Sequence, residues 1–282
     1  MVEPSARPLA LITGASAGIG ECFAHAYAAR GYDVALVARR LDRLETLAIE
    51  LRADHGVEAY PIAQDLAVFG AEAEVMQALA AHGRHVDVLV NNAGFSIAQD
   101  FAGVPWARQR DFLMTLIVTA SGLAHAVIPG MMERGRGAII NVASIAGFAP
   151  GVAGHSLYPA AKSYAIKFSE ALDAELRDKG IRVTALCPGS TESEFTKANG
   201  TADAGHGAPG FLLQTAQQVV EAAIAGNEAG KILVIPGVHN RIAVFLMRRL
   251  PHGLVRAILM KGSARFRLPP EPGTLPGTGA TH

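Results

Sequence analysis

The chain has 282 residues, half of them hydrophobic and 18% charged, so it can bury a large core as one α/β domain or as two smaller ones. Lys and Arg together number 25, as do Asp and Glu, and this balance gives no basis for nucleic-acid binding. The two cysteines, Cys22 and Cys187, lie in apolar stretches without metal-binding spacing, so we expect reduced thiols and no metal site. No signal peptide or uninterrupted apolar span is evident, so we expect a cytoplasmic protein.

The first predicted element is a strand that leads through a glycine-rich turn into a helix. An apolar run from Leu9 ends at Thr13, and the turn that follows carries Gly14, Gly18 and Gly20. Glycines let the chain turn sharply and let the backbone approach a ligand, while the N–H groups at the start of a helix attract an anion. The spacing Gly-x-x-x-Gly-x-Gly differs from the commoner Gly-x-Gly-x-x-Gly, and by itself it also fits an ordinary tight turn.

Apolar runs of strand length alternate with helical patterns along the rest of the chain. Further strands are predicted at 33–38, 57–63, 86–90, 138–142, 181–186 and 232–235. Helices are predicted between 19 and 31, around 44–51, and at 71–81, 106–134, 157–179 and 214–227, with Pro129 and Gly130 bending the last turns of the longest. This alternation predicts an α/β fold, a doubly wound, seven-stranded parallel sheet with helices on both faces. We expect one domain over residues 1–262, with a flap at about 194–213, and a disordered tail at 263–282.

Ligands bind at the carboxyl ends of the strands in a doubly wound sheet, so residues at those ends are candidates for a site. Arg39 and Arg40 follow the second strand, where an acidic residue would bind the ribose 2′-hydroxyl of NAD. Guanidinium groups suit a 2′-phosphate instead, and the pair therefore favours NADP over NAD. The alternative is a solvated basic pair at the start of an amphipathic helix.

Catalytic chemistry is predicted from three side chains after the fifth strand. Tyr158 and Lys162 stand four residues apart at the start of a helix and so share one face. A nearby ammonium and an oxidised nicotinamide both favour the phenolate, and so would lower the tyrosine pKa, which is ~10 in reference peptides. The hydroxyl of Ser144, at the end of the fifth strand, can hydrogen-bond a carbonyl oxygen that gains charge. The alternative for Tyr158 and Lys162 alone is a pair on a helix surface.

Residues 8–240 resemble a short-chain dehydrogenase/reductase. The motifs that carry the resemblance are Thr13-Gly14-Ala15-Ser16-Ala17-Gly18-Ile19-Gly20, Asp65-Leu66, Asn91-Asn92-Ala93-Gly94, Ser144, Tyr158-Pro159-Ala160-Ala161-Lys162 and Pro188-Gly189. The resemblance implies a Rossmann-type fold and an NADP-dependent transfer of hydride between nicotinamide and the carbonyl or alcohol carbon of a small substrate. It assigns Tyr158 as general acid/base, Lys162 to ribose binding and to lowering the tyrosine pKa, and Ser144 to the substrate oxygen.

The same resemblance implies the cofactor contacts and an assembly. Asp65 would contact the adenine end of the cofactor, Asn92 the ribose region and Thr191 the nicotinamide amide. Together with the two arginines, the predicted cofactor-binding residues are Gly14, Ser16, Gly18, Ile19, Gly20, Arg39, Arg40, Asp65, Leu66, Asn92, Ala93, Gly94, Tyr158, Lys162, Pro188, Gly189 and Thr191. A homodimer or homotetramer is expected.

Two positions depart from the family pattern. Leu116, thirteen residues before Pro129, stands where members usually have an asparagine. That asparagine helps to hold a distortion of the helix. A backbone carbonyl in the distortion binds a water molecule, which leads protons to the lysine. Leu116 still supplies a carbonyl, and Leu116→Asn should raise turnover if the side chain limits this relay. Ser193 replaces a frequent threonine and keeps the hydroxyl. The leucine at position 116 motivates an alternative function, a catalytically weak nucleotide sensor or scaffold. The presence of Ser144, Tyr158 and Lys162 argues against this alternative.

Apolar side chains are the candidates for lining the substrate pocket. They are Phe95, Ile145, Phe148, Leu157, Phe195, Phe211 and Leu212. Such a lining favours a hydrophobic ketone, aldehyde or secondary alcohol.

The stretch 229–270 contains eight basic residues and no acidic one, with largely apolar runs at 242–247 and 254–260 between them. This pattern can bind a membrane surface or lipid-like substrates. We favour the alternative, a helix that packs on the core or on a second subunit.

Overall fold

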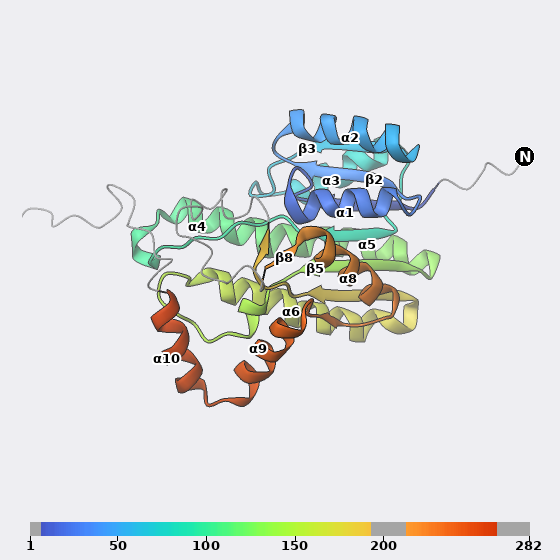
Figure 1. Cartoon of the computed structure of the whole chain (residues 1–282). Coiled ribbons are helices and arrows are strands. Elements are labelled where there is room, and N and C mark those ends of the chain that lie inside the picture. The colour runs from blue at the N-terminus through green and yellow to red at the C-terminus, as the bar shows by residue number, and fades with distance from the viewer. Residues whose placement is uncertain (1–6, 193–212, 264–282) are drawn as a thin grey trace, which may run out of the picture.

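The computed structural model describes residues 7–192 and 213–263 of the chain. Within them, one sheet contains seven parallel strands in the order β3-β2-β1-β4-β5-β6-β9 (Figure 1). The strands are β1 Leu9–Thr13, β2 Asp33–Ala38, β3 Ala59–Ala63, β4 Val88–Asn91, β5 Gly137–Val142, β6 Ile181–Leu186 and β9 Leu233–Val234. The strand order reverses between β1 and β4, which places a crevice outside the carboxyl ends of those two strands.

Helices cover both faces of the sheet, so the predicted doubly wound fold is confirmed. One face is covered by α1 Gly18–Ala28, α2 Leu41–His55 and α8 Ala216–Glu228. The other is covered by α3 Ala71–Ala81, α5 Thr119–Arg134 and α6 Leu157–Leu176. A small second sheet pairs β7 Thr191–Glu192 with β8 Gln214–Thr215.

Successive residues of the buried strands face the two helical layers in turn. In β1, Leu9 and Leu11 join the cluster under α3, α5 and α6, whereas Ala10 and Ile12 join the cluster under α1, α2 and α8. All four side chains are fully buried. Because both faces are covered, the strands form continuous apolar runs, and their carboxyl ends are held in fixed positions at one edge of the sheet.

Some element boundaries differ from the predicted ones. β3 and β4 begin at Ala59 and Val88, and the helix after β5 ends at Leu176, with a short 3₁₀ turn to Lys179. The helix predicted from 214 begins at Ala216, because Thr215 caps it and accepts a hydrogen bond from the Gln218 N–H at 3.2 Å. These differences leave the order of the elements unchanged.

The stretch predicted as one helix over 106–134 is interrupted near its middle. Helix α4 Trp106–Leu113 leads into a π-helical turn, Met114–Val118, and α5 follows directly. The prediction placed a bend near Pro129, which lies inside α5, whereas the interruption lies at the π-turn. By length and composition, this stretch is also the one candidate membrane span within the described residues. In the structure, however, side chains of α5 are buried in the hydrophobic core against one face of the sheet.

Two further helices, α9 Val238–Arg249 and α10 His252–Ser263, follow β9. They lie at the end of the molecule opposite β3 and α2 (Figure 1). The predicted flap at 194–213 and the predicted tail at 263–282 fall almost entirely outside the described residues, so both stay predictions, as does the single domain over 1–262.

Candidate active site

A cleft of about 1130 Å³ lies at the carboxyl ends of the strands, around the reversal between β1 and β4. Seventeen of the predicted site residues line it: Gly14, Ser16, Gly18, Ile19, Arg39, Arg40, Asp65, Leu66, Asn92, Ala93, Gly94, Ser144, Tyr158, Lys162, Pro188, Gly189 and Thr191. Small-molecule pockets commonly measure about 300–1,000 Å³. The cleft therefore has room for a dinucleotide together with a small substrate.

Gly20 does not line this cleft. A Cβ atom on Gly20 would lie 2.2 Å from the carbonyl oxygen of Gly14 and 2.6 Å from Nδ2 of Asn92. Gly20 is therefore needed for the close packing of α1 behind the loop, and its predicted contact with the cofactor stays a prediction.

The loop after β1 has the backbone geometry of a phosphate-binding turn. Gly14 and Gly18 have φ angles of 67° and 59°, in the left-handed region that favours glycine. The Gly14 N–H donates to the carbonyl of Val37 at 2.8 Å, which ties the loop to the end of β2. Helix α1 starts at Gly18, and the first N–H groups of a helix have no partner within it, so they are available to an anion.

Asn92 joins this loop to the end of β4. Its side-chain Nδ2 donates to the carbonyl oxygens of Thr13 at 2.9 Å and Gly14 at 3.3 Å. The Thr13 hydroxyl in turn accepts hydrogen bonds from the N–H groups of Asn92 and Ala93, both at 3.0 Å. The amide of Asn92 thus shapes the loop, and its predicted contact with the cofactor ribose stays a prediction.

Basic side chains occupy the end of the cleft next to β2. Arg39 and Arg40 are exposed there, and Arg40 Nη2 donates to the Ser16 hydroxyl at 3.0 Å. Because β1 and β2 are neighbours, this pair lies beside the glycine loop. The geometry gives a site for two anionic groups, one at the start of α1 and one at the arginines.

The three predicted catalytic side chains meet in the cleft, although they come from two elements. Ser144 follows β5, while Tyr158 and Lys162 lie in the first turns of α6, and the Ser144 side chain hydrogen-bonds that of Tyr158. Ser144 Oγ also accepts a hydrogen bond from the N–H of Ala146 at 3.1 Å. Lys162 Nζ donates to the carbonyl of Val142 at 2.7 Å and lies 5.5 Å from the centre of the tyrosine ring.

Burial controls the protonation of these groups. Burial raises the pKa of Tyr158 to about 12, and the hydrogen bond with Ser144 lowers it only in part. Burial lowers the pKa of Lys162 to about 8, with a smaller opposing effect from Cys187. Desolvation of the phenolate is the largest of these effects, so without a cofactor the chain's own groups keep Tyr158 protonated at neutral pH. The expectation that the lysine and an oxidised nicotinamide lower the tyrosine pKa stays a prediction.

Several residues that line the cleft were not predicted. Arg43 follows the two predicted arginines in α2, and Arg108, Asp111 and Thr115 come from α4 and the π-turn. The last three follow an i, i+3, i+7 spacing, which places them on one side of a helix. That spacing was visible in the sequence, but nothing there shows which side of the helix faces the cleft.

The predicted substrate lining is only partly found in the cleft. Phe95 and Ile145 line it. Phe148 and Leu157 do not line it, although they pack in the same hydrophobic clusters as Ile145 and Phe95 respectively. The remaining three candidates, Phe195, Phe211 and Leu212, lie outside the described residues.

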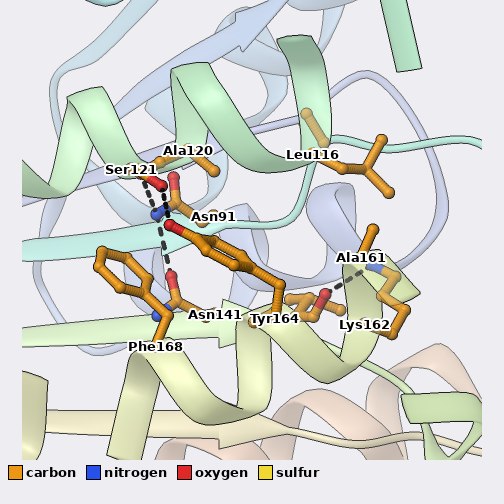
Figure 2. A pocket seen from close by; sticks show the side chains of 12 residues that line it. Asn91, Leu116, Ala120, Ser121, Asn141, Ala161, Lys162, Tyr164 and Phe168 are labelled. Atoms are coloured by element: carbon orange, nitrogen blue, oxygen red, sulfur yellow. Dashed lines mark hydrogen bonds between the residues drawn. The ribbon is translucent and has the colours of Figure 1, made fainter. Parts of the chain in front are cut away.

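A second, small cavity of about 20 Å³ lies beside Lys162, between α5, α6 and the strands β4 and β5 (Figure 2). Asn91 Nδ2 donates to the carbonyl of Ala120 and to Oδ1 of Asn141, both at 3.0 Å. Oδ1 of Asn91, in contrast, is buried without a partner among the described residues. The cavity has polar groups in part of its lining and has room for one water molecule, so it suits a water that donates to this oxygen.

Leu116 lines the same cavity from the π-turn. Its side chain is 8% exposed and packs with Phe112 and Ala161, and a Cβ on Gly94 would meet it at 3.3 Å. The π-turn therefore forms without the asparagine that is usual at this position, held by apolar packing.

Comparisons with known proteins agree with this geometry. The family model of the short-chain dehydrogenases matches residues 8–204. The chain is 40% identical to an uncharacterized oxidoreductase of Myxococcus xanthus (strain DK1622) over 199 residues, 71% of this chain and 78% of that protein. It is 33% identical to the very-long-chain 3-oxoacyl-CoA reductase of Anas platyrhynchos over 272 residues, 94% of this chain and 82% of that protein. A short-chain dehydrogenase from Sphingobium yanoikuyae, solved in complex with NADPH, has a TM-score of 0.75 and 32% identity, covering 86% of this chain and 96% of that one. The chain therefore belongs to the short-chain dehydrogenase family of oxidoreductases, which act on alcohol and carbonyl groups.

Proposed function

We propose that this protein is an NADP-dependent oxidoreductase that interconverts a carbonyl compound and its alcohol, with Tyr158 as general acid/base. The observation that carries the proposal is the meeting of Ser144, Tyr158 and Lys162 in the cleft that also contains the glycine loop and the two arginines. A nucleotide sensor would need the glycine loop but not the three catalytic side chains. The sensor alternative is motivated by Leu116, and the π-turn forms with this leucine in place.

The residues of the cleft fit NADP. The start of α1 and the loop with Gly14 and Gly18 suit the pyrophosphate, and Arg39 and Arg40 suit the 2′-phosphate. The existing hydrogen bond from Arg40 to Ser16 holds one guanidinium beside the loop before any ligand binds. The solved relative that contains NADPH supports the same assignment.

The chain's own groups are arranged for carbonyl reduction. When bound, the cofactor supplies the hydride to the carbonyl carbon. Ser144 donates a hydrogen bond to the carbonyl oxygen and holds it beside the tyrosine. Tyr158, protonated at neutral pH because of its raised pKa, gives its proton to that oxygen as negative charge develops there. In the oxidative direction Tyr158 must first lose its proton, so the pH dependence of the two directions should be opposite.

The cavity beside Lys162 offers a source for the replacement proton. A water held by Asn91 Oδ1 would lie between the lysine and the hydrogen-bonded hydroxyls of Ser121 and Tyr164, which are 2.8 Å apart (Figure 2). Tyr164 is 37% exposed, so this chain of polar groups reaches solvent. In this proposal the lysine, rather than the side chain at position 116, connects the site to the proton supply.

The first prediction concerns Leu116→Asn. Because the π-turn and the polar cavity already exist, we expect turnover to change less than twofold. The buried amide should lower the free energy of unfolding by about 1–3 kcal/mol. Steady-state kinetics and thermal melts of parent and variant check both parts. A clear gain in turnover would instead show that the leucine limits the relay, as the sequence alone suggested.

The second prediction concerns cofactor preference. The parent should use NADPH in preference to NADH, and Arg40→Ala should lower kcat/KM for NADPH about 10- to 100-fold, because a charge-assisted contact to the phosphate is lost. The value for NADH should hardly change, since NADH lacks the 2′-phosphate, and this makes NADH the internal control. Equal losses with both cofactors would assign Arg40 to the structure of the loop, and equal use of both by the parent would contradict the NADP assignment.

A hydrophobic ketone, aldehyde or secondary alcohol is the proposed class of substrate. Phe95 and Ile145 line the cleft near Ser144, and the very-long-chain 3-oxoacyl-CoA reductase matches nearly the whole chain. A panel of carbonyl compounds of increasing chain length, assayed by the loss of NADPH absorbance, tests this class. Activity restricted to short, charged carbonyls would contradict it. A cytoplasmic location and a homodimer or homotetramer are proposed as well.

A further inference from the structure

The two C-terminal helices leave large apolar side chains uncovered. In α9, Val238, Ile242 and Phe245 are 62%, 54% and 57% exposed and follow an i, i+4, i+7 spacing, which places them in one stripe. In α10, Leu254 and Ile258 are 50% and 57% exposed and stand one turn apart. The sequence favoured packing on the core or on a second subunit. Packing on the core is incomplete, because each helix has a buried side and an exposed apolar side.

The buried side fixes α9 next to the cleft. Val244 and Asn240 are buried, and the Asn240 side chain packs against Gly189, which lines the cleft, so closely that it leaves no room for a Cβ there. The guanidinium of Arg248 lies 5.4 Å from the centre of the Phe148 ring, in the 3₁₀ turn that follows Ser144. The exposed apolar stripe of α9 is thus presented by a helix that is anchored beside the catalytic serine.

The surroundings of these apolar side chains are positively charged. Between 229 and 263 the chain has six basic residues and no acidic one. Five of the basic residues are exposed on α9 and α10: Arg241, Arg248, Arg249, Arg256 and Lys261. Helices with exposed apolar side chains and basic neighbours lie on anionic bilayers, where the apolar side chains enter the interface and the basic ones meet phosphate groups.

A second copy of the same surface is a poorer match. In a symmetric dimer the same patch lies on both subunits, so this patch would place arginines against arginines without any acidic partner from α9 or α10. Like charges facing one another across an interface are unfavourable. An anionic surface matches both the charge and the apolar stripes.

We propose that α9 and α10 form a docking surface for an anionic lipid bilayer. The inner leaflet of a cell membrane is anionic, so this docking is compatible with the proposed cytoplasmic location. If the proposed function holds as well, docking brings the Ser144 side of the cleft near the bilayer, where hydrophobic carbonyl compounds concentrate. Binding to vesicles does not depend on that reaction, so each can fail without the other.

The test is flotation of the full-length protein with vesicles. One set contains phosphatidylcholine and phosphatidylglycerol at a ratio of 7:3, and the other contains phosphatidylcholine alone. Phe245→Gln/Ile258→Gln removes apolar contacts, and Arg256→Gln/Lys261→Gln removes charge. The matched controls are Ile49→Gln, an apolar residue 63% exposed on α2, and Lys179→Gln/Arg182→Gln, two exposed basic residues elsewhere.

The parent and both controls should float with the anionic vesicles and stay in solution with the neutral ones. Each α9–α10 variant should lose at least tenfold in vesicle affinity and keep the parent's melting temperature. Failure of the parent to bind anionic vesicles would overturn the proposal, as would equal binding by the parent and both α9–α10 variants. Light scattering without vesicles adds a further check: if the apolar variant dissociates a parent oligomer and still binds vesicles like the parent, the surface is a subunit contact.

Discussion

Tyr158→Phe should reduce kcat for carbonyl reduction by a factor of about 10² to 10⁴, the usual contribution of a general acid. The substitution removes one hydroxyl and keeps the ring, which lies 5.5 Å from Lys162 Nζ at the edge of the cleft. Affinity for NADPH should stay within about threefold of the parent, since no charge of the cofactor site is changed. Stopped-flow measurement of hydride transfer and fluorescence titration with NADPH separate the two effects.

Tyr164→Phe is the matched control for this substitution. It removes a hydroxyl from the same helix, and the lost hydrogen bond joins Tyr164 to Ser121 at the far side of the small cavity. The control should keep most of the activity, with an effect confined to the rate at which protons are replaced. Turnover by Tyr158→Phe that equals the parent's would show that another group supplies the proton, and the proposed mechanism would be wrong.

The sheet could be predicted closely because its strands are covered on both faces. The run Asp33–Ala38 is buried at every position, so it appears in the sequence as an apolar block with the same boundaries as β2. Burial alone does not fix the ends of a strand, since β4 is buried at every position and still starts two residues later than predicted. β3 has only one fully buried end and starts two residues later than predicted. Strand order then placed the predicted cofactor and catalytic residues, apart from Gly20, along one cleft.

The π-turn at Met114–Val118 could not be predicted in the same way. An apolar stretch with helical spacing gives the same pattern whether its hydrogen bonds follow the α or the π register. The side chain usually associated with the distortion is also missing here, since Leu116 takes its place. Similarly, the small pairing of Thr191 with Gln214 joins residues far apart in the chain, and short polar segments carry no periodicity that would indicate it.

The protonation of the catalytic groups could not be predicted from the sequence, because it depends on burial that only the folded chain creates. A Tyr-x-x-x-Lys spacing indicates that the two side chains are neighbours, and the predicted lowering of the tyrosine pKa rests on the ammonium and on the charge of an oxidised nicotinamide together. In the structure the ammonium of Lys162 donates to the carbonyl of Val142. Desolvation raises the pKa of Tyr158 to about 12 and lowers the pKa of Lys162 to about 8. The buried lysine therefore has a cost for the fold, which leads to the second main prediction.

Lys162→Met should stabilise the protein at pH 7 while reducing turnover more than a hundredfold. The pKa of Lys162 falls from 10.5 in the unfolded chain to about 8 in the folded one. Between these values the unfolded chain binds more protons, so stability rises with pH across this window, and below pH 8 the buried ammonium destabilises the fold by about 3 kcal/mol. The methionine lacks this charge but also leaves the carbonyl of Val142 without its donor, which costs about 1 kcal/mol.

The net gain of about 2 kcal/mol at pH 7 should appear as a melting temperature higher by about 4–8 °C, measured without cofactor. The gain should shrink as the pH rises from 8 towards 10, because the parent then loses the buried charge that the variant never had. Lys167→Met is the control, since Lys167 lies on the same helix with an exposed side chain paired to Glu170 and should show no such pH dependence. Melting temperatures of Lys162→Met that run parallel to the parent's from pH 6.5 to 10 would mean that the lysine keeps its ordinary pKa. In Lys162→Met, stability should rise while turnover falls. A purely structural lysine would not give these opposite changes, so together they assign Lys162 a role in the site.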